Sequence, residues 1–154
     1  MPKKTSVKKA SKSLVEKKST PRKAAKKTET KKTKSKTKIS DASMTLAKLV
    51  VEGMQEKKAN NVKILDLRGI SNRVCDIFVV CDAESTTHVN SIADSVSETV
   101  KKKTNEKPFH TEGWENSQWI LIDYVNVVAH VFMRETREFY NIEGLWADAQ
   151  ISEI

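Results

Sequence analysis

The chain has 154 residues, the length of one ordinary domain, and a formal net charge of +8. This charge is unevenly distributed: residues 1–38 contain 16 Lys and Arg against two Glu, a net charge of +14, whereas residues 39–154 contain 12 basic and 18 acidic residues, a net charge of −6. No apolar run is long enough for a membrane span, and none follows the basic start as in a secretory signal. We therefore expect a soluble, cytoplasmic protein with one core.

The first segment, residues 1–38, consists mostly of Lys, Thr, Ser and Ala and has no sustained apolar stripe. Such a segment buries too little surface to offset its ordering entropy, so we expect a disordered arm. Its lysines suit the phosphates of RNA or DNA without sequence specificity. The residues expected to make these contacts are Lys23, Lys26, Lys27, Lys31 and Lys32. A solubilising tail without a partner and a nuclear address are the alternatives.

Residues 39–154 contain apolar patterns that predict a helix, two strands, a second helix, three strands and a short third helix. The first helix follows N-cap candidates at 39–43, ends near residues 59–61 and has one apolar face, formed by Leu46, Leu49, Val50 and Met54. The later elements are strands at 62–67 and 75–81, a helix from Ser85 or Thr86 to 103, strands at 108–112, 119–124 and 127–133, and a helix at 134–141.

The order of these elements, α-β-β-α-β-β-β-α, predicts an α/β (α+β) fold with a mixed five-stranded sheet and flanking helices. The run at 77–80 is apolar on both faces, which is typical of a strand with layers on both sides. The second helix is long enough to cross the sheet, so the second and third strands can be parallel, and the last three form an antiparallel meander. Asn126 is expected to take the positive φ of the sharp turn before Val127.

The meander concentrates polar and aromatic side chains. Residues of equal parity share one face of a strand, so Trp119 and Asp123 point one way and Tyr124 points the other. With Glu112 and His130 of the neighbouring strands, Trp119 and Asp123 would form an acidic, aromatic patch that suits a basic protein partner. The predicted partner-binding residues are Glu112, Trp119, Asp123, Tyr124 and His130. The alternative for Trp119 is that it completes the core.

Reactive groups show no converging pattern in the sequence. It has no phosphate-binding glycine loop, no nucleophile elbow and no metal-ligand spacing among its three His and two Cys. Cys75 and Cys81 lie in or beside an apolar run and are expected to be buried free thiols. We therefore predict no catalytic residue, no metal site and no cofactor. The remaining enzymatic alternative is a metal-dependent nucleotidyltransferase that uses Asp66, Asp76 or Asp82, all near strand ends.

Several blocks of residues occur in a characteristic order along the globular part. They are Val79-Val80-Cys81 with residues 85–94, then Glu112-Gly113, residues 119–124, residues 127–132 and residues 137–146. In this order and spacing the chain resembles the ribosomal silencing factor family (RsfS or Iojap) over about residues 44–148. Two positions depart from the family's usual pattern. Where the family has Asp-x-Gly-Asp-Val at the hairpin, this chain has Val125 in place of the glycine, and the loop before Ser85 lacks the usual Thr-Gly.

The resemblance implies a fold related to nucleotidyltransferases without their active site, and a non-enzymatic factor that represses translation. It implies that residues 39–154 bind a large-subunit ribosomal protein on the intersubunit face, the fourteenth in the universal naming, and so keep the small subunit from joining. The arm at residues 1–38 is an addition to the usual family domain and would contact ribosomal RNA. A nucleic-acid-binding protein that acts through the arm is the alternative, and the sequence leaves open whether the domain forms a homodimer.

Overall fold

The computed structural model describes residues 29–154, with side chains from residue 41 onward. The expected arm residues Lys23, Lys26 and Lys27 therefore lie outside the described residues, and only the backbone is described for Lys31 and Lys32. The elements in chain order are α1 (Glu29–Glu56), β1 (Asn60–Asp66), β2 (Ile77–Ala83), α2 (Thr86–Thr104), β3 (His110–Glu112), β4 (Trp119–Asp123), β5 (Val127–Met133), α3 (Arg134–Tyr140), α4 (Ile142–Leu145) and β6 (Gln150–Glu153).

The strands form one mixed sheet in the order β3-β4-β5-β2-β1-β6. β2 pairs with β5 in parallel, and the other neighbouring strands are antiparallel. All seven residues of β2 are buried, as predicted for a strand with layers on both faces. The mixed sheet and the antiparallel meander are thus confirmed. The parallel neighbour of β2 is β5 and not β3, because the meander returns its last strand to the centre of the sheet.

The prediction of five strands is wrong, because β6 adds a sixth strand beside β1. All four β6 residues are exposed, so the segment lacks the apolar alternation that marks a half-buried strand. Its backbone pairs with β1, and its Glu153 carboxylate lies 2.8 Å from the Lys63 Nζ atom. The short helix α4 is likewise missing from the predicted order, since four residues give no helical period.

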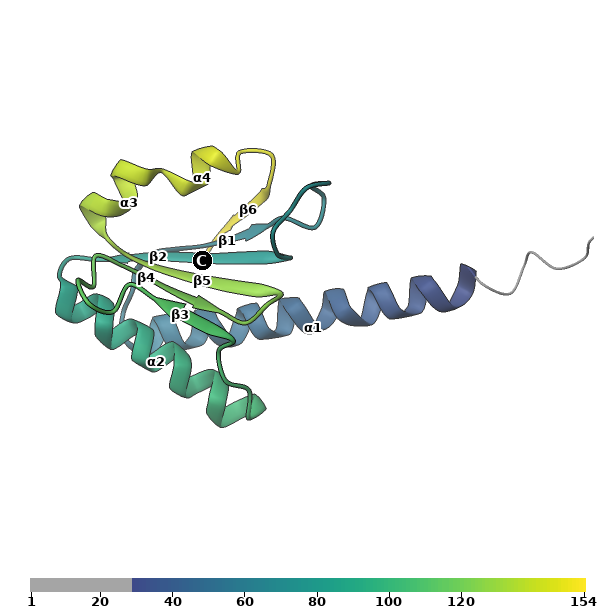
Figure 1. Ribbon diagram of the computed structural model, residues 1–154, viewed down its shortest axis with the longest axis horizontal. Coiled ribbons are helices and arrows are strands. Elements are labelled where there is room, and N and C mark those ends of the chain that lie inside the picture. Colours follow the sequence, from purple (N-terminus) through teal and green to yellow (C-terminus); the bar gives the residue numbers. More distant parts are fainter. Residues whose placement is uncertain (1–28) are drawn as a thin grey trace, which may run out of the picture.

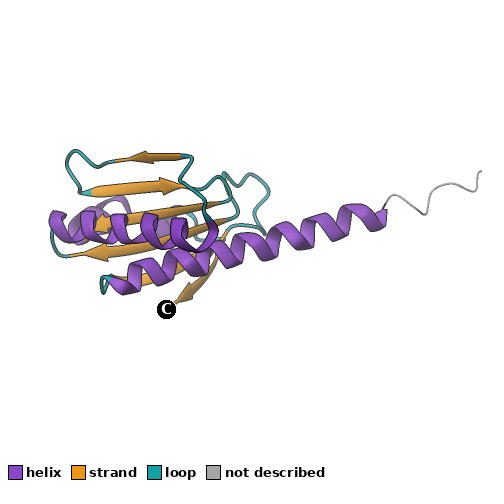
Figure 2. Cartoon of the chain, turned by 90° about the horizontal axis from the view of Figure 1, so that it is seen from below, coloured by secondary structure: helices purple, strands orange, loops and turns teal. Residues whose placement is uncertain are grey.

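Helices cover the two faces of the sheet in separate layers (Figures 1 and 2). α1 and α2 lie side by side on one face, and α3 and α4 lie on the other. α1 and α2 approach closely at Gly53, where an added Cβ atom would be 2.7 Å from the Cα atom of Val96. The main core lies between these helices and the sheet and includes the fully buried side chains of Met54, Ile92 and Ile122.

The predicted start of the first helix at residues 39–43 is wrong, because α1 already begins at Glu29 and its first turns project from the body (Figure 1). Lys is a good helix former, and no Gly or Pro lies between Pro21 and Gly53 to interrupt the helix. Residues 29–38, for which disorder was expected, are thus helical. None of the helices described between residues 29 and 154 is long and apolar enough to span a membrane.

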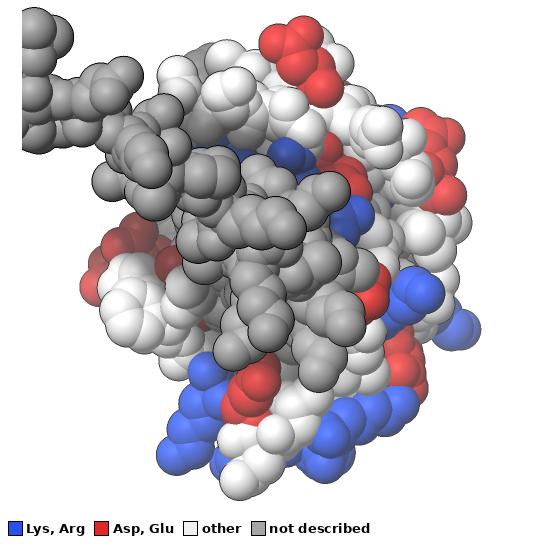
Figure 3. Space-filling model, turned by 90° about the vertical axis from the view of Figure 1, so that its right-hand side faces the viewer, with Lys and Arg blue, Asp and Glu red and all other residues white. Residues whose placement is uncertain are grey.

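The second helix, α2, has the predicted ends. Ser85 is its N-cap, and the Ser85 side-chain oxygen accepts a hydrogen bond from the His88 N–H group at 3.2 Å. Lysines occupy positions 101–103 in the last turn, where positive charge complements the helix dipole, and Asn105 ends the helix in a left-handed conformation. Figure 3 looks toward the end of the molecule at which α1 leaves the body and shows Lys and Arg side chains gathered along its lower part.

A second, smaller core lies on the opposite face of the sheet. Its buried members include Leu65 of β1, Phe78 of β2 and Phe132 of β5, and Ile142 and Trp146 from the C-terminal segment pack against them. These contacts cover the central strands, whereas Glu112 on the edge strand β3 is exposed. The C-terminal helices therefore leave β3 uncovered on this face and cover β4 only in part.

Candidate protein-docking surface

The two faces of β4 lie in different environments. Ile120 and Ile122 are fully buried in the main core beneath α1 and α2. Trp119, Leu121 and Asp123, on the opposite face, are only partly buried. The predicted alternation along this strand is therefore confirmed, and it places Trp119 and Asp123 on the partly covered face of the sheet.

The edge strand β3 adds polar side chains to the partly covered face. Glu112 pairs with Leu121, and His110 pairs with Asp123 in the antiparallel ladder. His110 and Glu112 are both exposed, and the His110 Nε2 atom lies 2.7 Å from a carboxylate oxygen of Glu112. The carboxylates of Glu112 and Asp123 thus border the apolar side chain of Leu121.

Trp119 is the centre of an aromatic cluster at the border between the sheet and α3. Its ring stacks on Phe132 of β5, with ring centroids 4.8 Å apart, and lies 5.1 Å from the ring of Tyr140 in α3. Its Nε1–H group donates a hydrogen bond to Nδ1 of His130 at 3.2 Å. Packing therefore fixes the orientation of the ring while part of it stays accessible, which is what a binding anchor requires.

His130 lies beneath Trp119 and is only 3 % exposed, so it does not reach the surface as a direct polar contact. Burial lowers the pKa of its imidazole to about 4, and the ring is therefore neutral at neutral pH and accepts the indole hydrogen bond. The ring also meets the edge of Phe78 at a centroid distance of 4.7 Å. These contacts make His130 a residue that positions Trp119.

Two aromatic residues of α3 extend the surface beyond the predicted set. Tyr140 is 50 % exposed and Phe139 is 81 % exposed, and their rings meet edge to face with centroids 5.1 Å apart. Two adjacent residues of one helix cannot both face the core, so a pair of neighbouring aromatic residues indicates in the sequence that at least one of them is exposed. The docking surface is defined here as Glu112, Trp119, Leu121, Asp123 and Tyr140.

The predicted contact residue Tyr124 lies on the other face of the sheet, outside the docking surface. It is 7 % exposed and belongs to the main core beneath α1 and α2. Burial raises the pKa of its phenol to about 12. Tyr124 is therefore not available at the docking surface, because the alternation that exposes Asp123 turns the next residue inward.

The hairpin between β4 and β5 turns at Val125, which has a φ of 72°, and not at Asn126 as predicted. The Asn126 carbonyl oxygen accepts backbone hydrogen bonds from Asp76 and Ile77 at 3.0 and 3.1 Å, and these bonds fix its orientation at the start of β2. The Asn126 N–H group donates to the Tyr124 carbonyl oxygen at 2.9 Å, so Val125 is the central residue of a γ-turn. Val125 stands where the resembled family usually has glycine.

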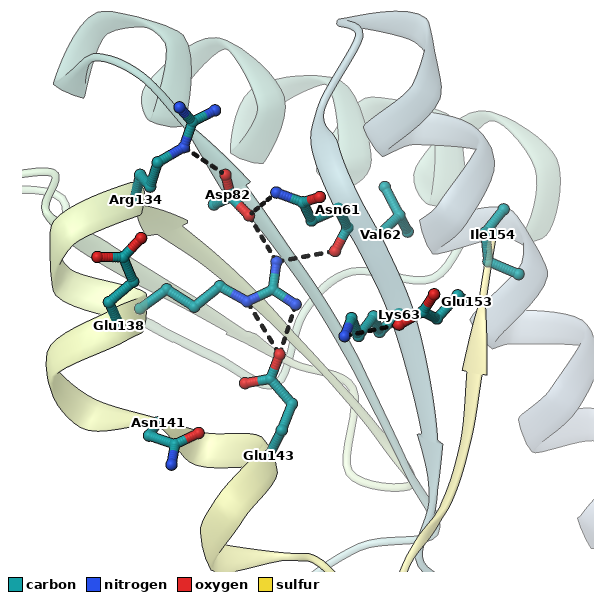
Figure 4. Close-up of a pocket in the computed structure, with 11 residues that line it drawn as sticks. Asn61, Val62, Lys63, Asp82, Arg134, Glu138, Asn141, Glu143, Glu153 and Ile154 are labelled. Atoms are coloured by element: carbon teal, nitrogen blue, oxygen red, sulfur yellow. Dashed lines mark hydrogen bonds and ion pairs between the residues drawn. The ribbon is translucent and has the colours of Figure 1, made fainter.

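A buried ion-pair network anchors α3 to the sheet at the carboxyl ends of β2 and β5 (Figure 4). The guanidinium of Arg137, a residue only 8 % exposed, donates to Asp82 Oδ1 at 2.6 Å and to the Asn61 carbonyl oxygen at 2.8 Å. It also donates to Glu143 at 3.0 Å, and Arg134 lies 3.5 Å from the second Asp82 oxygen. These residues line an open cavity of about 510 Å³. The network fixes α3, and with it the aromatic residues at its end.

The three acidic residues considered for a nucleotidyltransferase site do not gather in one place. Asp66 and Asp76 lie at the same end of the paired strands β1 and β2, and each forms an ion pair with an Arg. Asp76 precedes β2 and Asp82 lies near its far end, which separates them by about 20 Å along the strand. Asp66 is paired with Arg68, whose hydrogen bond lowers the pKa of the carboxyl group. Between residues 41 and 154, where side chains are described, no three His, Cys, Asp or Glu side chains gather as they would around a metal ion. The geometry does not assemble the acidic group that this alternative needs.

Both cysteines are buried and free, as predicted. Burial raises the pKa of the Cys75 thiol to about 12 and also raises that of Cys81. A thiol with a raised pKa carries little thiolate at neutral pH, so neither side chain is activated as a nucleophile.

Comparison with known proteins identifies the family of the chain. The sequence model described as "Ribosomal silencing factor during starvation" (RsfS) matches residues 39–154. The chain is 35 % identical over 113 residues to the ribosomal silencing factor RsfS of Halalkalibacterium halodurans. The aligned region covers 73 % of this chain and 95 % of that protein. It is 26 % identical over 112 residues to the mouse protein named mitochondrial assembly of ribosomal large subunit protein 1, covering 69 % of this chain and 49 % of that protein.

The fold agrees with these similarities. A crystal structure of a Chromobacterium violaceum protein matches with a TM-score of 0.64 and 28 % sequence identity, covering 68 % of this chain and 85 % of that chain. The family description names a regulator of the ribosome and not an enzyme. With a family match across residues 39–154 and a closely similar fold, the chain belongs to the ribosomal silencing factor (RsfS) family.

Proposed function

We propose that this chain silences ribosomes in the cytoplasm by binding the large subunit through its docking surface and blocking the small subunit from joining. The family name supports the ribosomal role, and the mouse relative is named for assembly of the mitochondrial ribosomal large subunit. The observation that supports a binding mechanism is the partly covered face of the sheet, where the anchored Trp119 and the exposed Tyr140 lie near two carboxylates. Occupancy of one surface is sufficient for this function, and no turnover is needed.

The partner that fits the docking surface is a basic protein. Residues 39–154 have a net charge of −6, and Glu112 and Asp123 place negative charge beside apolar anchors. Opposite charge steers the encounter, and aromatic anchors that leave water supply most of the binding energy. The resemblance to the family names the fourteenth large-subunit protein, on the intersubunit face, as this partner. A compact domain held there excludes the small subunit sterically.

The basic segment at residues 1–38 supplies a second binding element for the same particle. Its net charge of +14 attracts the phosphates of ribosomal RNA, and each neutralised phosphate releases a condensed counterion. α1 connects this segment to the domain, because the helix runs without a break from Glu29 to Glu56. Two tethered binding elements raise the overall affinity above that of either one.

Sedimentation with separated ribosomal subunits tests the docking surface. We expect the wild-type chain to follow the large subunit, and Glu112→Lys to weaken this association about tenfold or more because a cation then faces the basic partner. Tyr140→Ala removes half-exposed aromatic surface and should also weaken binding. Asp94→Lys is the matched control, since it reverses the charge of an exposed residue on α2, away from the docking surface.

Trp119→Ala is less suitable as a test, because Trp119 also packs on Phe132 and donates the hydrogen bond to Nδ1 of His130. If both Glu112→Lys and Tyr140→Ala bound the large subunit as tightly as the wild type does, the proposed role of the docking surface would be rejected. Deletion of residues 1–38 should weaken binding and flatten its salt dependence without abolishing it. An unchanged salt dependence would reject the RNA contact of the arm.

A further inference from the structure

A groove lies at the end of the molecule where α1 leaves the globular body. Its walls are formed by Leu46 and Leu49 of α1, Phe109 of the α2–β3 connection and Val125 of the β4–β5 hairpin. The open cavity measures about 590 Å³, a size that holds a small organic group. The groove lies on the side of the sheet that α1 and α2 cover, and the docking surface lies on the other side.

Phe109 gives this groove an accessible aromatic wall. Its side chain is 78 % exposed, yet its backbone is fixed directly before β3, where its N–H group donates to the Asp123 carbonyl oxygen at 2.7 Å. Val125, another residue that lines the groove, is 60 % exposed and is held by the γ-turn of the hairpin. An accessible ring on a fixed backbone offers a platform on which a planar group can stack.

Lysines flank the groove where α2 ends. They occupy positions 101–103 and 107, and all four are exposed. The side chains at 102 and 103 form ion pairs with acidic residues of α2 and α1. Lys101 and Lys107 form none with the side chains that are described, from residue 41 onward, so their charges are available to an anion. This end of the molecule carries the Lys and Arg side chains seen in the lower part of Figure 3.

Beyond the groove, α1 continues into a Lys-rich stretch of sequence. From Asp41 back to Glu29 the helix continues for about 18 Å, and the sequence from 29 to 40 contains five Lys and one Glu. Glu106 is the acidic side chain among the residues that line the groove, and it lies next to Lys107. Asp41, which precedes the lining residue Ala42, is also exposed, and Asp76 accepts a hydrogen bond from the lining residue Ser43. The excess of Lys near the groove therefore comes from Lys101, Lys107 and the Lys-rich sequence of residues 29–40.

We propose that this groove binds an unpaired nucleotide of single-stranded RNA, with the base stacked on Phe109 and the flanking phosphates beside Lys101 and Lys107. Apolar walls with an aromatic ring suit a base, and the surrounding lysines suit a phosphate chain. An apolar peptide would use only the first of these features. The inference rests on the proposed function in one respect, which is that the RNA belongs to the large ribosomal subunit. The groove would then supplement the nonspecific RNA contacts of the basic segment at residues 1–38 with a site that prefers unpaired strands.

The test uses the full chain and a short fluorescein-labelled single-stranded RNA that contains 2-aminopurine. Phe109→Ala should weaken binding about fivefold or more and reduce the quenching of 2-aminopurine that base stacking causes, while the salt dependence stays the same. Phe139→Ala is the matched control, because it truncates another highly exposed Phe and should bind RNA as the wild type does. Lys101→Ala combined with Lys107→Ala should make the plot of log affinity against log salt concentration less steep by about 1.4, because each lost phosphate contact to a single strand contributes about 0.7.

Equal RNA affinity and equal quenching for Phe109→Ala and the wild type would overturn the inference. Equal affinity for a duplex of the same sequence would do so as well, because a paired base cannot enter the groove. If Phe109→Ala weakened binding of a Glu-rich peptide and not of RNA, the groove would be a peptide site and the inference would fail. Glu112→Lys should keep wild-type RNA binding while it loses the large subunit, so the inference and the proposed function can fail separately.

Discussion

The hairpin between β4 and β5 holds a backbone conformation whose cost can be measured. Val125 has a φ of 72°, a region that β-branched residues rarely adopt. Its side chain is 60 % exposed, so little apolar burial is lost when the side chain is removed. Glycine adopts positive φ without steric cost, and Val125→Gly should therefore stabilise the domain.

The expected magnitude follows from two opposing effects. Relief of a sparsely populated backbone conformation is worth about 1–3 kcal/mol. Glycine also makes the unfolded chain more flexible, which costs about 0.4–1 kcal/mol. The free energy of unfolding should therefore rise by about 1 kcal/mol, which corresponds to an increase in Tm of about 4 °C for a domain of this size.

Thermal and urea unfolding of the full chain, followed by circular dichroism, measure this change. Val74→Gly is the matched control, because Val74 is 72 % exposed in the β1–β2 connection and has no positive φ. It should lose about 0.4–1 kcal/mol, since it gains flexibility in the unfolded chain without relief of strain. Val125→Ala retains the Cβ atom and should gain less than Val125→Gly. A loss of stability in Val125→Gly equal to that in Val74→Gly would refute the reasoning.

Arg137→Met leaves the buried Asp82 carboxylate without its main cation, so urea denaturation should show a loss of about 3–5 kcal/mol, and a change near zero would contradict the anchoring role. Burial lowers the pKa of His130 from 6.5 to about 4, so its contribution to stability is present above pH 6.5 and is lost as the pH falls toward 4. His130→Gln should flatten that part of the stability profile by up to about 3 kcal/mol, and an unchanged profile would show that the ring is not buried as described. Gly53→Ala places a methyl group 2.7 Å from the Val96 Cα atom and should cost about 2 kcal/mol in thermal unfolding despite better helix propensity. A raised Tm would mean that α1 and α2 pack less closely.

Apolar periodicity predicts the elements of this fold that bury a face. β2 is recognisable in the sequence because residues 77–80 are apolar on both faces, and α2 because an apolar stripe lies between a capping Ser85 and a basic last turn. β6 could not be predicted from apolar periodicity, because its residues are exposed and it is held by backbone pairing with β1. The first turns of α1 could not be predicted for a similar reason, since they lie beyond the core and depend on helix propensity alone.

The docking surface is predictable only in part. Alternation places Trp119 and Asp123 on one face, because this relation depends on strand parity alone. The burial of His130 and the contribution of Tyr140 depend instead on where α3 packs. That position is set by the bond between Arg137 and β2, which joins residues 55 positions apart, and no local pattern in the sequence reports such a contact.

The most direct measurement of the proposed function is light scattering of ribosomal subunit association, with large subunits first incubated with saturating protein. We predict that the wild-type chain prevents association, that Glu112→Lys permits it, and that Asp94→Lys prevents it as the wild type does. Normal association in the presence of the wild-type chain, or equal inhibition by Glu112→Lys, would show that the docking surface does not hold this protein between the subunits.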